Sequence, residues 1–300
     1  MRQTINTEWV FNRYQQVRNR LPSSTFPKAT KIVPDLGSLI DQFDVFVFDS
    51  FGVLNVGSSP IPGAVDRIRQ LRAMNKHVYI LTNAASIPLD RLEEKYDRLG
   101  FDFKLPEIIS SREVLIKALE SFDPEMNWAV ISEKDFNVQD LPVKTHQYTG
   151  AKSQPCDGYI FLSSAGWSEQ HQSILQSHLE KSGKPFLIAN PDLAAPREDA
   201  ITFEPGVYAH DLADQLKLSP LFFGKPYGNA FDLLKERLIT PVATDRMLMI
   251  GDTLHTDILG GKAAGLQTAL VTAHGVLRDL DPADCISSSG IVPDFQMPSI

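Results

Sequence analysis

The sequence predicts an α/β protein whose core is a doubly wound parallel sheet, with a large α/β domain inserted into it. Short apolar runs alternate along the chain with amphipathic segments, which is typical of strands that helices bury on both faces. Four of these runs end in polar clusters. A long stretch, residues 84–223, separates the second cluster from the third and carries its own apolar runs, so we expect it to hold the inserted domain.

Composition and charge exclude several classes of protein. The chain has 300 residues, of which 43% are hydrophobic and 22% charged, so a disordered, collagen-like or disulfide-scaffold protein is excluded. A formal net charge of −8 argues against a nucleic-acid or membrane-surface partner. Apolar runs such as residues 45–48 are too short to span a bilayer. Cys156 and Cys285 lack metal-ligand spacing, which favours a reducing, cytoplasmic location.

The first 42 residues differ from the rest, and we expect them to form a helical arm. Apolar residues recur at helical spacing at Val10, Tyr14, Val17 and Leu21. The segment up to residue 31 contains several basic residues but one acidic residue, Glu8. One interpretation is an arm that docks its Trp9 and Tyr14 side onto the body or onto a second subunit as a homodimer. The alternative is an organelle-targeting segment, because such segments are also amphipathic, Arg-rich and poor in acids.

The remaining elements follow from periodicity and divide the chain into two predicted domains. The core, residues 43–87 and 206–300, has expected strands at 43–48, 77–81, 222–224 and 247–250, and helices at 63–75, 228–238 and 256–264. The inserted domain, residues 88–205, has expected strands at 127–132, 157–163, 186–190 and 200–203, and helices at 112–121 and 169–181. A homodimer through this domain is a further expectation.

The four polar clusters should meet, because ligands of such sheets lie beyond the carboxyl ends of the strands. The clusters begin at Asp49, Thr82, Gly224 and Gly251. Each cluster taken alone has a purely structural explanation. An Asp at a strand end is usually a turn former, and Gly-Asp-Thr is a good helix cap.

Together the clusters favour phosphoryl transfer. Asp49 and Asp252 would form a hard oxygen site suited to Mg²⁺, because two carboxylates in a cleft need a cation. Lys225 would add a positive charge, and Thr82 with neighbouring N–H groups would donate to phosphate oxygens. A carboxylate nucleophile, a metal and a lysine are what transfer through an aspartyl-phosphate requires.

At these residues the sequence resembles the haloacid dehalogenase superfamily, subfamily IIA, whose members include NagD-like sugar phosphatases and p-nitrophenyl phosphatases. The resemblance runs from about residue 43 to the C-terminus. Its motifs are Phe48-Asp49-Ser50-Phe51-Gly52-Val53-Leu54, Pro60-Ile61-Pro62-Gly63-Ala64, Leu81-Thr82-Asn83, Ala189-Asn190-Pro191-Asp192, Pro205-Gly206, Gly224-Lys225-Pro226 and the run from Gly251-Asp252-Thr253 to His255-Thr256-Asp257-Ile258.

The resemblance implies a role for each matching residue. Asp49 resembles the nucleophile and a metal ligand, and Lys225 the lysine that orients nucleophile and phosphate. Thr82, with the adjacent Asn83, resembles the phosphate-binding segment. Asp252 resembles the acidic metal ligand, with Asp257 as a partner that lies behind the ligands or reaches the metal through water. The implied cofactor is Mg²⁺, and the implied partner is a small phosphorylated substrate such as a sugar phosphate.

Phe51 departs from the family pattern. The family's phosphatases carry a second Asp at this place, which protonates the leaving alcohol, whereas the backbone carbonyl of Phe51 still offers a metal ligand. Loss of a general acid–base typically costs about 10²–10⁴ in rate. Three interpretations follow: a phosphatase that needs little help or borrows a donor, a weakly catalytic protein that binds a phosphorylated metabolite, or dehalogenase- or phosphonatase-like chemistry.

The inserted domain should set specificity, because the core motifs recognise only phosphate. Trp167 resembles a segment that faces the site in relatives and would stack on a substrate ring, although packing against the core is as good an interpretation. Arg197 would pair a substrate carboxylate. As borrowed proton donors we consider His255, Glu198 and Asp199.

Overall fold

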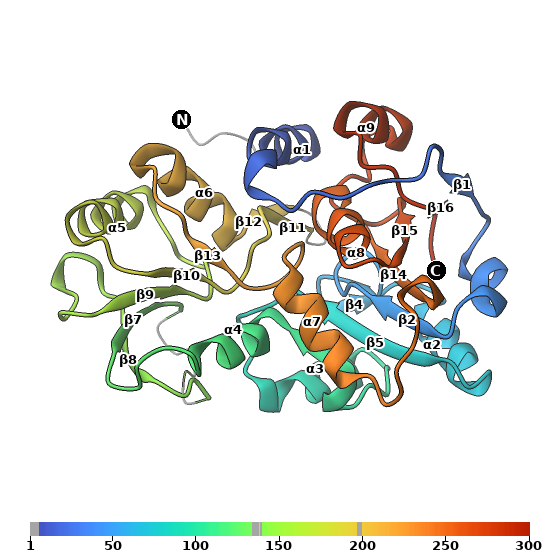
Figure 1. The fold of residues 1–300 in the computed structure, drawn as a ribbon, viewed down its shortest axis with the longest axis horizontal. Helices are drawn as coiled ribbons and strands as arrows, with labels where there is room; N and C mark the ends of the chain where they lie inside the picture. Colours follow the sequence, from blue (N-terminus) through green and yellow to red (C-terminus); the bar gives the residue numbers. More distant parts are fainter. Residues whose placement is uncertain (1–5, 134–137, 139, 197–199) are drawn as a thin grey trace.

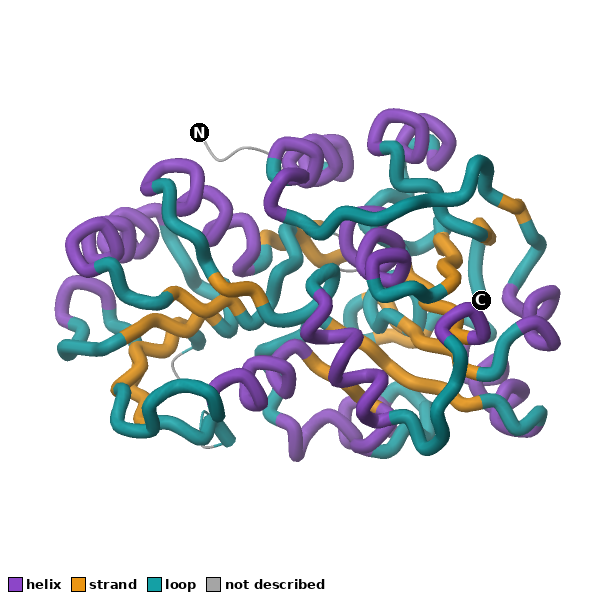
Figure 2. The backbone as a smooth tube through the Cα atoms, viewed as in Figure 1, coloured by secondary structure: helices purple, strands orange, loops and turns teal. Residues whose placement is uncertain are grey.

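The computed structural model describes residues 6–133, 138, 140–196 and 200–300. Its strands form two separate groups with helices on the outside (Figure 2). We call the part around the seven-stranded sheet the larger lobe and the part around the five-stranded sheet the smaller lobe (Figure 1). Within the described ranges, no helix combines the length and apolar character that crossing a bilayer requires.

The larger sheet has seven strands, and every neighbouring pair is parallel. Its order is β1-β16-β15-β14-β2-β5-β6. The strands are β1 (Lys31–Ile32), β2 (Val45–Phe48), β5 (His77–Thr82), β6 (Ile108–Ser110), β14 (Met247–Gly251), β15 (Gln267–Val271) and β16 (Phe295–Met297). The predicted doubly wound parallel sheet is therefore confirmed.

Helices bury both faces of this sheet, which explains why its central strands are apolar throughout. On β2, Phe46 and Phe48 face the cluster under α2 (Ala64–Ala73) and α3 (Leu92–Arg98). Val45 and Val47 face the opposite cluster, which includes residues of α4 (Ser111–Leu119) and α7 (Gly228–Arg237). Burial on both faces removes the polar alternation that a half-exposed strand would show.

The smaller sheet is also parallel throughout and belongs to the inserted domain. Its order is β13-β10-β9-β7-β8. Its strands are β7 (Asn127–Ile131), β8 (Lys144–Gln147), β9 (Gly158–Phe161), β10 (Phe186–Ile188) and β13 (Leu221–Phe222), and its outer helices are α5 (Glu169–Ser182) and α6 (Pro205–Leu216). The opposite face shares one apolar cluster with α4 and α7, so these two helices join the lobes.

Shorter elements complete the chain. They are two antiparallel hairpins, β3 (Asn55–Val56) with β4 (Ser59–Pro60) and β11 (Ala194–Pro196) with β12 (Ile201–Phe203), a π-helical turn (Leu254–Ile258), helices α8 (Leu259–Ala263) and α9 (Pro282–Ser289), and 3₁₀ turns at Arg18–Arg20, Leu36–Gln42, Leu89–Arg91, Leu105–Glu107, Gly150–Lys152 and Thr244–Arg246.

Three strand assignments at the domain boundaries differ from the prediction. Residues 31–32, expected in the helical arm, form β1 at one edge of the larger sheet. Residues 108–110, expected in the inserted domain, form β6 at the edge of the larger sheet. The strand expected in the core at residues 222–224 is β13, which pairs with β10 of the smaller sheet. The chain therefore leaves the larger sheet after residue 110 rather than at 88, and α6 belongs to the smaller lobe. A two- or three-residue apolar run does not encode which sheet it joins.

The N-terminal arm docks onto its own chain, across both lobes (Figure 1). Its helix α1 (Thr7–Gln16) begins at Asn6, whose side chain accepts a hydrogen bond from the Trp9 N–H at 2.8 Å. On one side Arg13 pairs with α6 of the smaller lobe. On the other side the ring of Tyr14 stacks on His255 of the larger lobe, with ring centroids 5.0 Å apart. A homodimer through the arm or through the smaller lobe stays a prediction.

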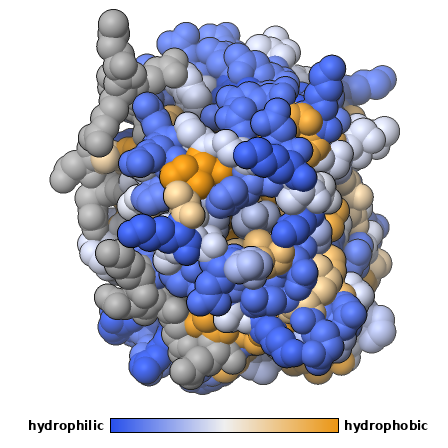
Figure 3. Space-filling model, turned by 90° about the vertical axis from the view of Figure 1, so that its left-hand side faces the viewer, coloured by the Kyte–Doolittle hydropathy of each residue, from blue (hydrophilic) through white to orange (hydrophobic). Residues whose placement is uncertain are grey.

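The end of the molecule formed by the smaller lobe is mainly hydrophilic, with apolar side chains in separate spots (Figure 3). The reason lies in α5, whose Leu175 and Leu179 turn inward onto the smaller sheet while its charged residues stay outside. We look for the site between the lobes, because the strand ends of the larger sheet meet the β11–β12 hairpin there.

Candidate active site

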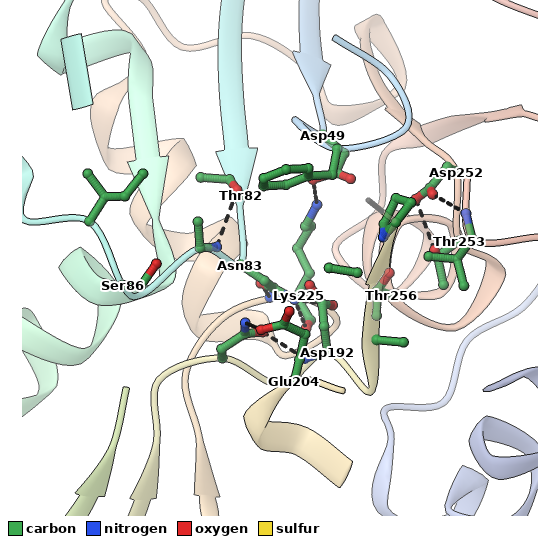
Figure 4. Close-up of a pocket in the computed structure, with 18 residues that line it drawn as sticks. Asp49, Thr82, Asn83, Ser86, Asp192, Glu204, Lys225, Asp252, Thr253 and Thr256 are labelled. Carbon is green, nitrogen blue, oxygen red and sulfur yellow. Dashed lines mark hydrogen bonds and ion pairs between the residues drawn. The ribbon is translucent and has the colours of Figure 1, made fainter. Parts of the chain in front are cut away.

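The carboxyl ends of three neighbouring strands bring the predicted polar residues to one cavity. Asp49 follows β2, Thr82 ends β5, and Asp252 follows β14, and these strands lie side by side in the order β14-β2-β5. The cavity measures about 180 Å³ and is lined by Asp49, Thr82, Asn83, Lys225 and Asp252, together with residues after β10 (Figure 4). The convergence that the sequence predicts is thus present.

Lys225 connects two of the acids. Its Nζ lies 2.7 Å from Asp49 Oδ1 and 2.6 Å from Asp257 Oδ1, and its side chain is only 2% exposed. Burial alone would lower the pKa of Lys225, but the carboxylates of Asp257 and Asp49 outweigh burial and raise this pKa above its usual value. The ammonium group is therefore a permanent positive charge beside the Asp49 carboxylate.

Asp252 is held by hydrogen bonds from both sides. The Thr253 hydroxyl donates to Oδ1 at 2.9 Å, and the Val276 N–H donates to Oδ2 at 2.8 Å. Gly275 leaves the room for this carboxyl, because a Cβ there would lie 2.3 Å from Asp252 Cβ. Burial, followed by the nearby Asp49 charge, raises the pKa of Asp252 to about 8.

Asp257 occupies the π-helical turn after β14. Its Oδ2 accepts the Thr253 N–H at 3.1 Å, while its Oδ1 receives Lys225. Burial raises its pKa to about 6, even though Lys225 acts in the opposite direction. Asp49, Asp252 and Asp257 each place one carboxylate oxygen within 4.8 Å of the others.

The donor chemistry of this group fits a divalent cation. Hard carboxylate oxygens are what Mg²⁺ binds in proteins. One lysine stands among the three acids and pairs with Asp49 and Asp257 but not with Asp252, so a divalent cation would offset the charge of the ionised acids that Lys225 leaves unbalanced. Phe51, whose carbonyl we expect to contribute a ligand, lines the same cavity.

Asn83 uses its side chain within the protein rather than toward a ligand. Its Nδ2 donates to Asp192 Oδ1 at 2.8 Å and to the Lys225 carbonyl at 2.9 Å, and its Oδ1 accepts the Lys225 N–H at 2.7 Å. Both amide protons are thereby used. The Asn83 side chain thus positions Lys225 and Asp192, and the predicted place of Asn83 in the phosphate-binding segment stays a prediction for its backbone.

Phe51 occupies the place where the family's second Asp is expected. Its ring lines the cavity, and Lys95 Nζ lies 4.8 Å from the ring centroid. Lys95 also donates to the Ser50 hydroxyl at 3.2 Å. The position thus presents an aromatic surface and a nearby cation, with no carboxyl group of its own.

Two of the predicted specificity and proton-donor residues, Trp167 and His255, lie outside the described lining of the cavity. Trp167 packs against Phe161 with ring centroids 5.0 Å apart and bonds to Gln172, so it belongs to the smaller lobe's apolar cluster and is absent from the described cavity lining. His255 is fully buried against Tyr14, and burial lowers its pKa to about 3, both of which argue against the predicted role as a proton donor. Arg197, Glu198 and Asp199 lie outside the described residues.

Sequence reasoning missed the contribution of the segment after β10. Asn190, Asp192 and Glu204 all line the cavity (Figure 4), although Asn190-Pro191-Asp192 reads first as a turn. The available signal was a carboxylate shortly after a buried strand, the same signal that identifies Asp49 and Asp252.

Comparison with known proteins agrees with this geometry. A model described as haloacid dehalogenase-like hydrolase matches residues 46–139, and a second, HAD-hydrolase-like model matches residues 222–296. The chain belongs to the haloacid dehalogenase superfamily. The matched segments carry Asp49 and Thr82 in the first case and Lys225, Asp252 and Asp257 in the second. The large inserted domain between them agrees with the NagD-like branch of this superfamily.

Three relatives illustrate the likeness. A 4-nitrophenylphosphatase of Schizosaccharomyces pombe is 24% identical over 287 residues, which cover 87% of this chain and 93% of the relative. The glycerol-3-phosphate phosphatase of Homo sapiens is 27% identical over 297 residues, covering 88% and 90%. A possible sugar phosphatase of the HAD superfamily from Cytophaga hutchinsonii superposes with a TM-score of 0.79 at 27% identity, covering 90% of this chain and 98% of that one.

Proposed function

We propose that this HAD-superfamily protein is a Mg²⁺-dependent phosphatase that hydrolyses small phosphate monoesters through an aspartyl-phosphate on Asp49. The pairing of Asp49 with the buried Lys225 at 2.7 Å, at the edge of an acid-lined cavity, carries the proposal. The named relatives, which are phosphatases of small molecules, support the substrate class.

The chain's own residues account for most of the chemistry. Lys225 bonds to Asp49 Oδ1, which leaves Oδ2 as the attacking atom on phosphorus. Lys225 also offsets negative charge on the transferring group, because it stays protonated between Asp49 and Asp257. The Thr82 hydroxyl lines the same cavity and donates to a phosphate oxygen in this scheme.

Mg²⁺, held by Asp49, Asp252 and the Phe51 carbonyl with Asp257 behind them, would neutralise negative charge on the phosphate and on the acids. Asp257 keeps Lys225 in position through its 2.6 Å ion pair.

The test is phosphate release from 4-nitrophenyl phosphate with Mg²⁺ and with EDTA. We expect activity with Mg²⁺ only, and none in Asp49→Asn. Asp44→Asn is the matched control, because Asp44 stands at the opposite end of β2 and pairs with the exposed Arg246. We also expect a rapidly quenched reaction to add one phosphoryl group to the peptide that contains Asp49.

Other outcomes would contradict the proposal. Full activity of Asp49→Asn would show that Asp49 is not the nucleophile. Mg²⁺-linked binding of a phosphate ester without turnover, across a broad panel, would instead favour the binding-protein interpretation. Metal-independent chloride release from a short haloacid would favour dehalogenase chemistry.

A further inference from the structure

The proposed reaction leaves one chemical need unmet at position 51. An alcohol leaves as an unstable alkoxide unless a proton reaches its oxygen, and Phe51 has no proton to give. His255, considered from the sequence, is buried against the N-terminal arm and lies outside the described lining of the cavity. Among the described residues, we therefore look for the donor in a side chain that lines the same cavity.

Asp192 is such a side chain. It lies between β10 and the β11–β12 hairpin, is partly exposed, and lines the cavity opposite the strand end that carries Asp49 (Figure 4). Its Oδ1 accepts the Asn83 amide at 2.8 Å, and the same amide donates to the Lys225 carbonyl. One side chain thus fixes Asp192 relative to the loop that carries Lys225, and within the described part of the chain no hydrogen bond to Asp192 Oδ2 occurs.

The backbone around Asp192 is fixed as well. Its N–H donates to Asn190 Oδ1 at 3.0 Å, and its carbonyl accepts the Gly206 N–H at 3.1 Å. The approach at Gly206 is so close that a Cβ there would lie 2.2 Å from the Pro191 carbonyl oxygen. The next N–H, of Leu193, donates to the Tyr14 hydroxyl of the N-terminal arm at 3.1 Å. A catalytic group needs this kind of support to hold its geometry.

The surroundings of Asp192 favour its protonated form. Burial raises its pKa well above the usual value, and the charges of Asp49 and Asp257 act in the same direction. Lys225 and the Asn83 amide act in the opposite direction without reversing the shift. Burial also raises the pKa of the neighbouring Tyr14, so that phenol stays neutral. These surroundings favour the carboxylic acid over the carboxylate, and the carboxylic acid is the form that can donate a proton.

We propose that Asp192 is the general acid and base of this site, in place of the carboxyl that position 51 lacks; the proposal rests on the phosphatase function above. Asp49 Oδ2 bonds to phosphorus while the bond from phosphorus to the leaving oxygen breaks, with its electron pair on that oxygen. The proton of Asp192 moves to the same oxygen, so the alcohol departs neutral and Asp192 becomes a carboxylate.

The second half-reaction restores both residues. Asp192 accepts a proton from a water molecule whose oxygen bonds to phosphorus. The bond between phosphorus and Asp49 then breaks, and its electron pair returns to the Asp49 carboxylate. Inorganic phosphate leaves, and Asp192 again carries the proton for the next cycle.

The experiment compares two leaving groups in Asp192→Asn, which keeps an oxygen for the Asn83 amide. For glycerol 3-phosphate we expect kcat to fall by about 10²–10⁴, because the alkoxide has lost its proton donor. For 4-nitrophenyl phosphate the leaving group is stable without a proton. We therefore expect the rate of phosphoryl transfer from this ester to Asp49 to fall by less than about tenfold. In the wild type, kcat for glycerol 3-phosphate should also fall on the alkaline side, and this fall should vanish in the variant.

Glu204→Gln is the matched control, since Glu204 is a second carboxylate in the cavity and bonds to Asn190 and Thr202. We expect it to keep the ratio of the alkyl to the aryl rate. Equal losses in the rate of phosphoryl transfer from both esters to Asp49 in Asp192→Asn, or a leaving-group-dependent loss in Glu204→Gln alone, would overturn the assignment while the phosphatase function stood.

Two further results distinguish a failure of the proposal for Asp192 from a failure of the proposed phosphatase function. If the wild type releases no phosphate from either ester with Mg²⁺, the proposed function and the role of Asp192 fall together. If Asp192→Asn does not fold, a series of aryl and alkyl esters on the wild type decides. A shallow dependence of the rate on leaving-group basicity supports an enzymatic proton donor, and a steep one overturns it.

Discussion

Replacing Asp252 by Asn should stabilise the protein when no metal is bound. Asp252 is buried beside Asp49 and Asp257, and the one lysine among them bonds to the other two acids. Ionising this carboxyl group is therefore costly, and without a cation to offset the cost the folded protein keeps the proton that the unfolded chain releases. An Asn of nearly the same shape keeps an oxygen for the Val276 N–H or the Thr253 hydroxyl and removes the charge.

The magnitude follows from the pKa shift. An unfolded Asp has a pKa of about 3.9, whereas burial and Asp49 raise that of Asp252 to about 8 in the folded protein. Between these values the folded state keeps a proton that the unfolded state has released, so its stability falls as pH rises through this window and is level outside it. At pH 7 this difference corresponds to about 3 pKa units, so it lowers the free energy of unfolding by about 4 kcal/mol. Asn can accept a hydrogen bond from only one of the two donors, the Thr253 hydroxyl and the Val276 N–H. We therefore expect Asp252→Asn to raise the free energy of unfolding by about 2–4 kcal/mol.

Urea unfolding at pH 7 in EDTA measures this gain, and repeating it with Mg²⁺ tests the metal site without reference to activity. Saturating Mg²⁺ at about 100 times its Kd should add about 2.7 kcal/mol to the wild type and much less to Asp252→Asn. Asp44→Asn is the control, because Asp44 is 44% exposed and its pair with Arg246 contributes at most about 1 kcal/mol.

The reasoning would be refuted by a loss of stability in Asp252→Asn in EDTA, together with an unchanged response to Mg²⁺. That pair of results would mean that the Asp252 carboxylate is satisfied by its own hydrogen bonds and that the cation binds elsewhere. A gain that disappears below about pH 4, where the folded and unfolded states are both protonated, would support the electrostatic cause.

Three other predictions follow from the same structure. Phe51→Asp, introduced into Asp192→Asn, should restore alkyl phosphate hydrolysis at least about tenfold, because it returns a carboxyl to the cavity; an unchanged kcat for glycerol 3-phosphate would contradict this. Burial lowers the pKa of His210 to about 3, so it stays neutral in the folded state while an unfolded His gains a proton below about pH 6.5. Stability should therefore fall as pH drops from about 6.5 toward 3, and urea unfolding of His210→Phe at pH 7 and pH 5 should show about 2 kcal/mol less loss than the wild type. Arg13→Met, which removes the 2.7 Å ion pairs to Asp211 and Asp214, should lower the free energy of unfolding by about 1–2 kcal/mol, and a change below about 0.3 kcal/mol would mean that the arm does not tie the lobes together.

Much of the site was predictable because its parts are local. Asp49, Thr82 and Asp252 each follow a short apolar run, and the carboxyl ends of neighbouring parallel strands always share one edge of a sheet. Lys225 also follows such a run, but that run is β13 of the smaller sheet, so its position beside Asp49 depends on how the two sheets are arranged. The departure at Phe51 was also visible in the sequence alone. The roles of these residues in catalysis stay predictions until the variants are measured.

Other parts depended on contacts between distant segments. Trp167 stood at a suitable strand end, yet it packs against Phe161 inside the smaller lobe. His255 stood within the metal motif, yet the N-terminal arm covers it. The amide of Asn83, beside a phosphate-binding motif, bonds to Asp192, which lies 109 residues along the chain. Sequence spacing carries no signal for such contacts.

The sequence by itself determined the alternation of strands and helices, the order of the polar clusters and the absence of a carboxyl at position 51, because each depends on residues that are near neighbours along the chain. Only the tertiary structure decided that β6 joins the larger sheet and β13 the smaller, and that the arm lies across both lobes. It also decided that Asp192 shares a cavity with Asp49. Strand pairing and the burial of a carboxyl depend on which surfaces fold against each other, and those surfaces come together only after long loops close.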